Sequence, residues 1–235
     1  MKRRALSLPA CLAVLLVGCD RATEKYTLPD RVTEFPVLYR DNCAGCHGLN
    51  GRLGAARPLN DPLYLAVIGK DQMRDVIAKG VPGTAMPAFA QNGGGSLTDQ
   101  QITILADQIE ARWSRPQDYA GVTLPPYSAD LGDARAGEAV FKTQCSRCHG
   151  DNGTGGAGRG GSVIEPALLS LESNQSIRTT VIAGRADLGC PNWKSDSPGH
   201  VMTPQEISDV VAWLSGHRTL ALTSLTEGTV DHDGQ

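Results

Sequence analysis

The chain has 235 residues, of which 40% are hydrophobic and only 5% are aromatic, and its 22 basic and 25 acidic side chains give a net charge of −3. This length is sufficient for one large domain or two small domains with buried cores. The acidic balance argues against a nucleic-acid-binding protein, which would carry a concentrated basic surface.

The first 18 residues predict an export signal. Three basic residues, Lys2 to Arg4, precede an apolar run from Ala10 to Val17 that is too short to span a bilayer. The run leads into Leu-Val-Gly-Cys19, which resembles the bacterial lipobox, where the cysteine is acylated. We therefore expect residues 1–18 to be a lipoprotein signal peptide and Cys19 to be the lipid anchor, with an ordinary secretory signal as the alternative.

Acylation of Cys19 would hold the protein at a membrane surface while the polypeptide stays in water. This predicts a location on the periplasmic side of a bacterial membrane, and Asp20 favours the inner membrane. Residues 19–34 are polar without a sustained period and predict a tether. Loss of the signal would lower the net charge to about −6, which suits a basic partner.

A short helix opened by Pro36 is predicted to lead into Cys43-Ala-Gly-Cys46-His47. C-x-x-C-H is the attachment signature of a c-type haem. Two thiols one helical turn apart can add to the haem vinyl groups, and the adjacent imidazole can bind the iron. A zinc site or a redox dithiol is the alternative, but no further cysteine pair is present to complete a zinc tetrahedron.

The same signature recurs at Cys145-Ser-Arg-Cys148-His149, and both copies continue as His-Gly-x-Asn-Gly. Two copies with one continuation indicate an internal repeat and two covalent haem c groups. The predicted attachment residues are Cys43, Cys46, Cys145 and Cys148, and the predicted proximal iron ligands are His47 and His149.

Two further helices are predicted in the first repeat. Asp71 to Lys79 has helical hydrophobic spacing and is ended by Gly80. Thr98 is placed to cap a helix that ends near Trp113, with Gln101 at the capping-box position. These elements give a first domain over residues 35–113.

The second repeat follows a proline-containing linker at residues 114–132 and is expected to form a domain over 133–218. Its predicted helices cover Arg135–Gln144, Ile177–Ala183 and a final segment capped by Thr203. Residues 219–235 are polar and predict a disordered tail.

The order of elements in each repeat resembles that of class I cytochrome c domains. In that family the order is a helix before C-x-x-C-H, a glycine loop, a middle helix, a Met-Pro segment and a capped last helix. The resemblance covers about Pro36 to Arg218 and implies a mainly α fold, with two tandem small helical domains, each around a covalent haem. It also implies that the first and last helices of each domain cross, near Gly137 and Trp213 in the second domain. Pro58 fits the family proline whose carbonyl accepts a hydrogen bond from the proximal histidine, whereas no proline lies at the same distance from His149.

Met86 is the expected sixth ligand of the first haem, because it lies in Ala85-Met86-Pro87, on a loop before the last helix, where the family places its ligand. The alternative is a methionine that fills a gap in the core. Iron held by histidine and methionine has no open position, which suits electron transfer and raises the potential.

Cys190 is the expected sixth ligand of the second haem. Counted from Gly80 and Gly184, it stands where Met86 stands in the first domain, and it is the cysteine that the motifs and the signal do not use. Met202, which aligns with Leu97 before the last helix, and His200 are the alternatives. A thiolate ligand would lower the potential of this haem.

The function implied by the resemblance is an electron carrier rather than an enzyme, and the sequence shows no catalytic constellation. It would pass single electrons from a quinol oxidoreductase or a periplasmic dehydrogenase to a soluble cytochrome or a terminal oxidase. Two alternatives are a redox enzyme similar to thiosulfate dehydrogenases, whose cysteine-ligated haem lies in the first domain rather than the second, and a cytochrome subunit of a larger oxidoreductase complex.

Overall fold

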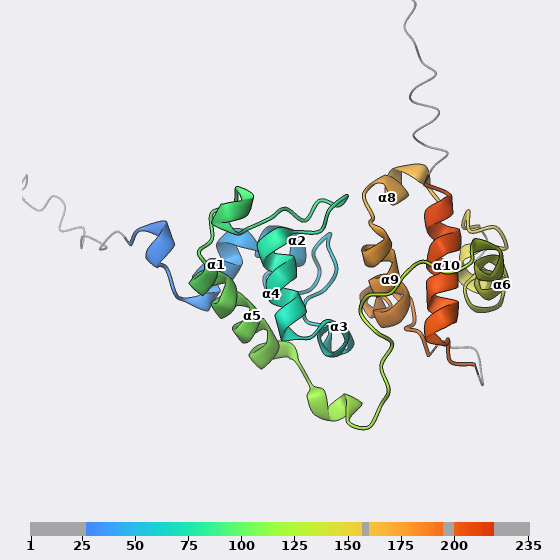
Figure 1. The fold of residues 1–235 in the computed structure, drawn as a ribbon, viewed down its shortest axis with the longest axis horizontal. Coiled ribbons are helices and arrows are strands. Elements are labelled where there is room, and N and C mark those ends of the chain that lie inside the picture. The colour runs from blue at the N-terminus through green and yellow to red at the C-terminus, as the bar shows by residue number, and fades with distance from the viewer. Residues whose placement is uncertain (1–26, 157–159, 195–199, 219–235) are drawn as a thin grey trace, which may run out of the picture.

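The computed structural model describes residues 27–156, 160–194 and 200–218. The predicted signal peptide, the anchor Cys19, the first half of the tether and the predicted tail lie outside these residues. Within them the structure is helical, without a strand, and β-pairing is limited to two isolated bridges. Two groups of helices stand at opposite ends of the molecule and are joined by the linker (Figure 1). The predicted mainly α fold is confirmed.

Five α-helices form the first group. They are α1 (Phe35–Asn42), α2 (Ala44–His47), α3 (Pro62–Ile68), α4 (Lys70–Lys79) and α5 (Asp99–Trp113), with the 3-10 turns η1 (Pro29–Arg31) before them and η2 (Gln91–Gly93) ahead of α5. Helices α1, α4 and α5 agree with the prediction. Helix α3 is present in the structure but is not predicted from the sequence, because its seven residues form a short apolar run without a helical period.

Helices α1 and α5 pack through an aromatic cluster. The ring centroids of Phe35 and Tyr39 lie 5.5 Å apart, and those of Tyr39 and Trp113 lie 5.4 Å apart. The expected capping box is present, since Thr98 and Gln101 exchange side-chain to backbone hydrogen bonds at the start of α5. The buried Gln101 amide also donates to the carbonyls of Pro29 and Val32, so the end of the predicted tether is held against α5.

In its described residues, the second group also has five α-helices. They are α6 (Ala134–Gln144), α7 (Ser146–His149), α8 (Pro166–Ser170), α9 (Asn174–Ala183) and α10 (Pro204–Gly216), with η3 (Pro116–Tyr119) in the linker and η4 (Ala186–Leu188) after α9. Helix α9 begins earlier than predicted because the hydroxyl of Ser173 accepts a hydrogen bond from the Ser176 N–H and caps it.

The expected crossing of first and last helices is confirmed in the second group. A Cβ on Gly137 of α6 would lie 2.0 Å from the carbonyl oxygen of Asp209 on α10, so only glycine allows this close approach. Beside it the rings of Phe141 and Trp213 stack with centroids 4.3 Å apart. Thr203 and Glu206 form the capping box of α10.

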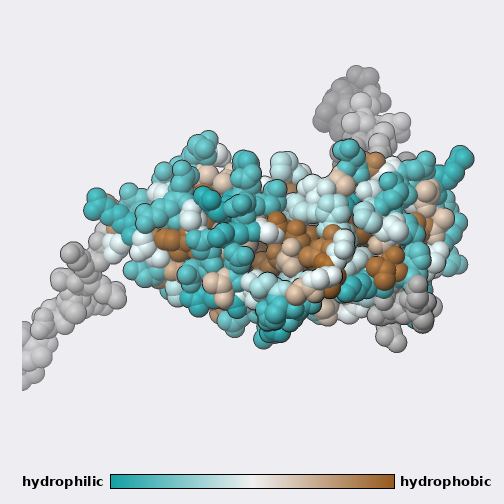
Figure 2. All heavy atoms as spheres, turned by 60° about the horizontal axis from the view of Figure 1, so that its bottom comes forward, coloured by the Kyte–Doolittle hydropathy of each residue, from teal (hydrophilic) through white to brown (hydrophobic). Residues whose placement is uncertain are grey.

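The linker is attached to the second group over its later part. The buried guanidinium of Arg178 donates to the carbonyls of Pro126 and Tyr127, and the Gly132 N–H donates to Ser208. Helix α3 of the first group contacts α9 of the second (Figure 1). Hydrophobic side chains reach the surface in the middle of the face drawn in Figure 2, between its hydrophilic ends. None of the described helices combines the length and the apolar character needed to cross a bilayer.

Candidate functional site

The first C-x-x-C-H motif forms a single helical turn between α1 and the following glycine loop. Cys43 lies at the junction of α1 and α2, and its carbonyl accepts hydrogen bonds from the N–H groups of Cys46 at 3.2 Å and His47 at 2.9 Å. The turn ends at Gly48, whose φ of 77° is one that glycine adopts without strain. Both thiols and the imidazole are therefore held within one turn, as haem attachment requires.

The imidazole of His47 is buried and oriented by a backbone carbonyl. Its Nδ1 lies 2.7 Å from the carbonyl oxygen of Arg57. Because a carbonyl only accepts, Nδ1 carries the proton and Nε2 keeps the lone pair that a metal needs. Burial lowers the pKa of His47, which also favours the neutral, ligating form.

The acceptor is Arg57 rather than Pro58, so the expectation about Pro58 is wrong by one residue. Proline restricts the residue before it to extended backbone conformations. Pro58 is thus placed to fix the backbone of Arg57, whose carbonyl makes the hydrogen bond to His47.

The second motif has the same construction without a proline. The N–H of His149 donates to Cys145 at 3.0 Å, and His149 Nδ1 lies 2.8 Å from the carbonyl oxygen of Gly161. A Cβ on Gly160 would lie 2.6 Å from His149 Nδ1, so the glycine loop closes directly against the ring. Pro166 begins α8 instead. In the sequence, the glycine-rich loop that ends at Gly161 is the feature from which this acceptor could have been predicted.

The surroundings of both motifs fit a covalent haem. Cys43 and Cys145 are half-buried, which suits thioether links to a porphyrin, and this burial raises the pKa of both thiols to about 12. In the part of the chain that the structure describes, the side-chain amide of Gln144, directly before Cys145, is buried without a hydrogen-bond partner. Buried amides normally have partners, so this one fits a site that a bound group completes. The described cysteines form no disulfide with one another.

The loop that holds Met86 is fixed by two hydrogen bonds and a close glycine contact. The Met86 carbonyl accepts from the Val81 N–H at 3.0 Å, and the Met86 N–H donates to the Thr84 hydroxyl at 3.1 Å. A Cβ on Gly80 would lie 2.6 Å from the Met86 carbonyl oxygen. The half-buried Met86 side chain is therefore carried by a defined turn after α4.

The loop that holds Cys190 repeats this turn after α9. The Cys190 carbonyl accepts from the Arg185 N–H at 3.0 Å, and a Cβ on Gly184 would lie 2.7 Å from the same carbonyl oxygen. Met86 and Cys190 both stand six residues after the helix-ending glycine, in the same backbone hydrogen bond. The two side chains therefore occupy equivalent positions.

Met202 and His200 are engaged elsewhere. Met202 is 6% exposed and its N–H donates to the Trp193 carbonyl, while Leu97 of the first group is 4% exposed and donates in the same way to Phe89. Met202 thus takes the core position of Leu97. His200 Nε2 lies 3.0 Å from a carboxylate oxygen of Glu206 at the start of α10.

A protein-family comparison matches the chain twice. The model described as cytochrome c oxidase, cbb3-type, subunit III, covers residues 30–108 and 132–214, which is more than half of the chain. Each matched segment contains one C-x-x-C-H motif and the loop that holds Met86 or Cys190.

Three relatives illustrate the range of similar proteins. The cbb3-type cytochrome c oxidase subunit CcoP of Azospirillum sp. (strain B510) is 31% identical over 172 residues, which are 66% of this chain and 53% of the relative. A thiosulfate dehydrogenase of Stutzerimonas stutzeri (strain A1501) is 25% identical over 81% of this chain and 64% of the relative. Cytochrome c55X of Paracoccus denitrificans (strain Pd 1222) is 40% identical over 43% of this chain and 90% of the relative.

The chain spans about half the length of the oxidase subunits that it matches. The family model nevertheless matches both domains, and each matched segment contains one motif, one oriented histidine and one of the two equivalent turns. The chain therefore belongs to the family of cbb3-type cytochrome c oxidase subunit III, and its two cytochrome c domains bind two haem c groups.

Proposed function

We propose that the chain is a membrane-tethered dihaem cytochrome that carries single electrons from a quinol- or dehydrogenase-type donor to a cytochrome or oxidase acceptor. The observation that carries the proposal is the duplicated site: each motif has an oriented proximal histidine, and each domain presents a sulfur side chain on the same fixed turn. Haem iron supplies the one-electron chemistry. Iron with a ligand on both faces undergoes little rearrangement on electron transfer.

Met86 is the proposed sixth ligand of the first haem, and Cys190 that of the second. Their equivalent turns support this pairing, and the burial of Met202 in the core and the contact of His200 with Glu206 argue against either alternative. A methionine thioether and a cysteine thiolate differ in charge and in electron donation, so the two haems would differ in potential. Unequal potentials would give the transfer a direction.

Cys19 is the proposed lipid anchor, and the periplasmic face of the inner membrane is the proposed location. The lipobox-like Leu-Val-Gly-Cys19 and the basic start of the chain support both. The similarity to oxidase subunits supports a terminal oxidase as one partner, either as a transient acceptor or as a complex that includes this chain. The acidic composition suits a basic docking surface on the partner.

The ligand proposal is tested by Cys190→Ser, with Met202→Leu as the matched control. Cys190→Ser is expected to change the low-spin absorption spectrum and raise the potential of the second haem, while Met202→Leu leaves both unchanged. An unchanged spectrum and potential in Cys190→Ser would reject the thiolate ligand.

The carrier proposal is tested by mixing the reduced, haem-loaded protein with an oxidised soluble cytochrome and with membranes that contain a terminal oxidase. Rapid oxidation that slows as salt rises is expected from an acidic donor on a basic acceptor. Oxidation no faster than that by an unrelated acidic cytochrome would reject the proposal.

A thiosulfate dehydrogenase activity is the second candidate, because that relative aligns with most of this chain and because Cys190 offers a sulfur-ligated haem. Steady-state turnover with thiosulfate and an artificial acceptor tests it. Negligible turnover in protein that still exchanges electrons rapidly would remove this candidate.

A further inference from the structure

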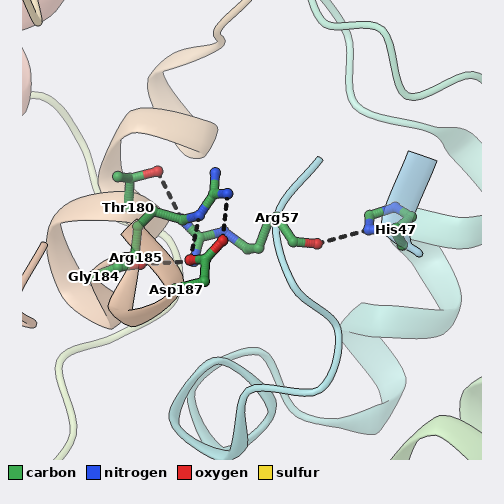
Figure 3. Close-up of polar contacts among 6 residues, drawn as sticks. All are labelled: His47, Arg57, Thr180, Gly184, Arg185 and Asp187. Carbon is green, nitrogen blue, oxygen red and sulfur yellow. Dashed lines mark hydrogen bonds and ion pairs between the residues drawn. The ribbon is translucent and has the colours of Figure 1, made fainter. Parts of the chain in front are cut away.

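Arg57 links the two haem-binding domains with its backbone and its side chain. Its carbonyl accepts the hydrogen bond from His47 at 2.7 Å. Its guanidinium reaches in the opposite direction to the second domain, where it donates to the Thr180 hydroxyl at 2.7 Å and to the Gly184 carbonyl at 3.3 Å (Figure 3). One residue therefore contacts both the proximal histidine of the first motif and the end of α9.

The contact at Gly184 continues into the turn that holds Cys190. Arg185, the next residue, exchanges two backbone hydrogen bonds with Cys190, both of 3.0 Å. The Arg185 side chain is itself held by Asp187 at 2.8 Å, in the position seen beside Arg57 in Figure 3. Arg57 therefore contacts a segment that is held in place by its own hydrogen bonds and ion pair.

The guanidinium of Arg57 keeps its charge in a largely enclosed place. The ring of Tyr64 lies over it at 5.5 Å, and burial lowers the pKa of Arg57, although arginine stays protonated in proteins. Among the described side chains, no carboxylate lies within 4.0 Å of this guanidinium, and its acceptors are an uncharged hydroxyl and a carbonyl. Asp61 and Glu172 attract this charge only from a longer range, and Arg185 adds a second positive charge nearby, so the charge of Arg57 is only partly offset where the domains meet.

We propose that Arg57 is a positioning residue that couples the two haem sites, so that a change at either site alters the redox equilibrium at the other. This inference rests on the proposed electron-carrier function and on the turn that contains Cys190. Two effects act together. The charge disfavours the oxidised, more positive state of each haem, and the hydrogen bonds fix His47 relative to the Gly184 carbonyl. Because such coupling is reciprocal, oxidation of the second haem must shift the redox equilibrium of the first by the same factor as the reverse.

The first test replaces Arg57 by methionine, which keeps much of the volume and removes the charge and the donors. A potentiometric titration followed by NMR of the haem methyl groups reports each haem separately. We expect the redox equilibrium constant of both haems to change at least threefold towards the oxidised state, about 28 mV for a one-electron couple. Arg52→Met removes an exposed charge from the same loop and is expected to leave both constants unchanged.

The second test perturbs the contact from the other side. Thr180→Val removes the hydroxyl that accepts from Arg57 while keeping the shape of the side chain, and we expect it to shift the potential of the first haem. If Arg57→Met changes the first haem alone and Thr180→Val leaves that haem unchanged, Arg57 is only a local support for His47 and the proposal is wrong. If Arg57→Met fails to fold, Thr180→Val decides the question. Both measurements use the purified haem-loaded protein without a partner, so their failure is distinct from failure of the electron-carrier proposal.

Discussion

Replacing Gly184 by alanine should disturb the second haem site, whereas the same substitution at Gly69, which has a similar backbone conformation and open space around it, should not. Gly184 has φ 73° and ψ −169°, a backbone region used almost only by glycine. An added Cβ would also lie 2.7 Å from the carbonyl oxygen of Cys190 and from the carbonyl carbon of Pro191. Both are backbone atoms, so the whole turn must move to make room.

The magnitude follows from separating these two costs. Gly69 has nearly the same backbone conformation, φ 67° and ψ 163°, but a Cβ there meets nothing within 4 Å. Gly69→Ala should therefore carry only the conformational cost, about 1–3 kcal/mol. Gly184→Ala should carry that cost plus an overpacking cost of about 1–3 kcal/mol.

Urea unfolding of the haem-loaded proteins, followed by absorption, gives the two free energies of unfolding. The low-spin spectrum of the second haem should also change in Gly184→Ala and stay unchanged in Gly69→Ala, because only the first substitution moves the turn of Cys190. Equal losses of stability, or a second haem that is unaltered in Gly184→Ala, would refute the close approach of Gly184 to this turn.

Three further predictions concern stability. Thr203→Ala removes the capping box of α10 and should lower the free energy of unfolding by about 0.5–2 kcal/mol, as measured by urea denaturation. Leu105→Ala, at a fully buried position, should cost about 2–5 kcal/mol, whereas Leu171→Ala, 60% exposed, should change stability by less than about 0.5 kcal/mol in the same assay. The hydrogen bond from Arg185 holds the pKa of Asp187 below its usual value. The stability from this pair is therefore complete above the unfolded pKa of about 3.9 and is lost as pH falls through the lower folded pKa. Unfolding curves between about pH 2 and pH 7 should show the advantage of the unsubstituted protein over Asp187→Asn shrinking in acid.

The sequence predicts well the features that depend only on residues close together in the chain. The capping box at Thr98 and the cap at Thr203 are each specified within four positions, and both are formed. Helix ends at Gly80 and Gly184 are likewise local, because glycine accepts the positive φ that ends a helix. The C-x-x-C-H turns belong to the same class, since their geometry is confined to five residues.

The features that escape prediction depend on contacts between distant residues. Helix α3 is a short apolar segment that becomes helical through the cap provided by Asp61 and through burial of its side chains. The acceptor for His149 is Gly161, which has no proline to mark it. Arg57 and Thr180 are 123 positions apart in the chain, and no local pattern predicts a hydrogen bond between residues so far apart.

The two domains show that the backbone and the chemistry of a haem site can vary independently. After α4 and after α9 the same backbone hydrogen bond closes a turn that begins at a glycine, and no larger residue fits at that glycine. The backbone therefore sets the position of the residue proposed as the sixth ligand. The side chain at this position adds little to the hydrogen bonds of the turn, since the Cys190 thiol makes one long contact, 3.7 Å to the Pro191 carbonyl. We therefore expect an exchange of one side chain for the other to have little effect on folding, and under the proposed ligation it would change the charge and the electron donation at the iron. Under the proposed ligation, this separation would let one repeated fold hold two haems of different potential, and the direction of electron flow would depend on two side chains rather than on the architecture.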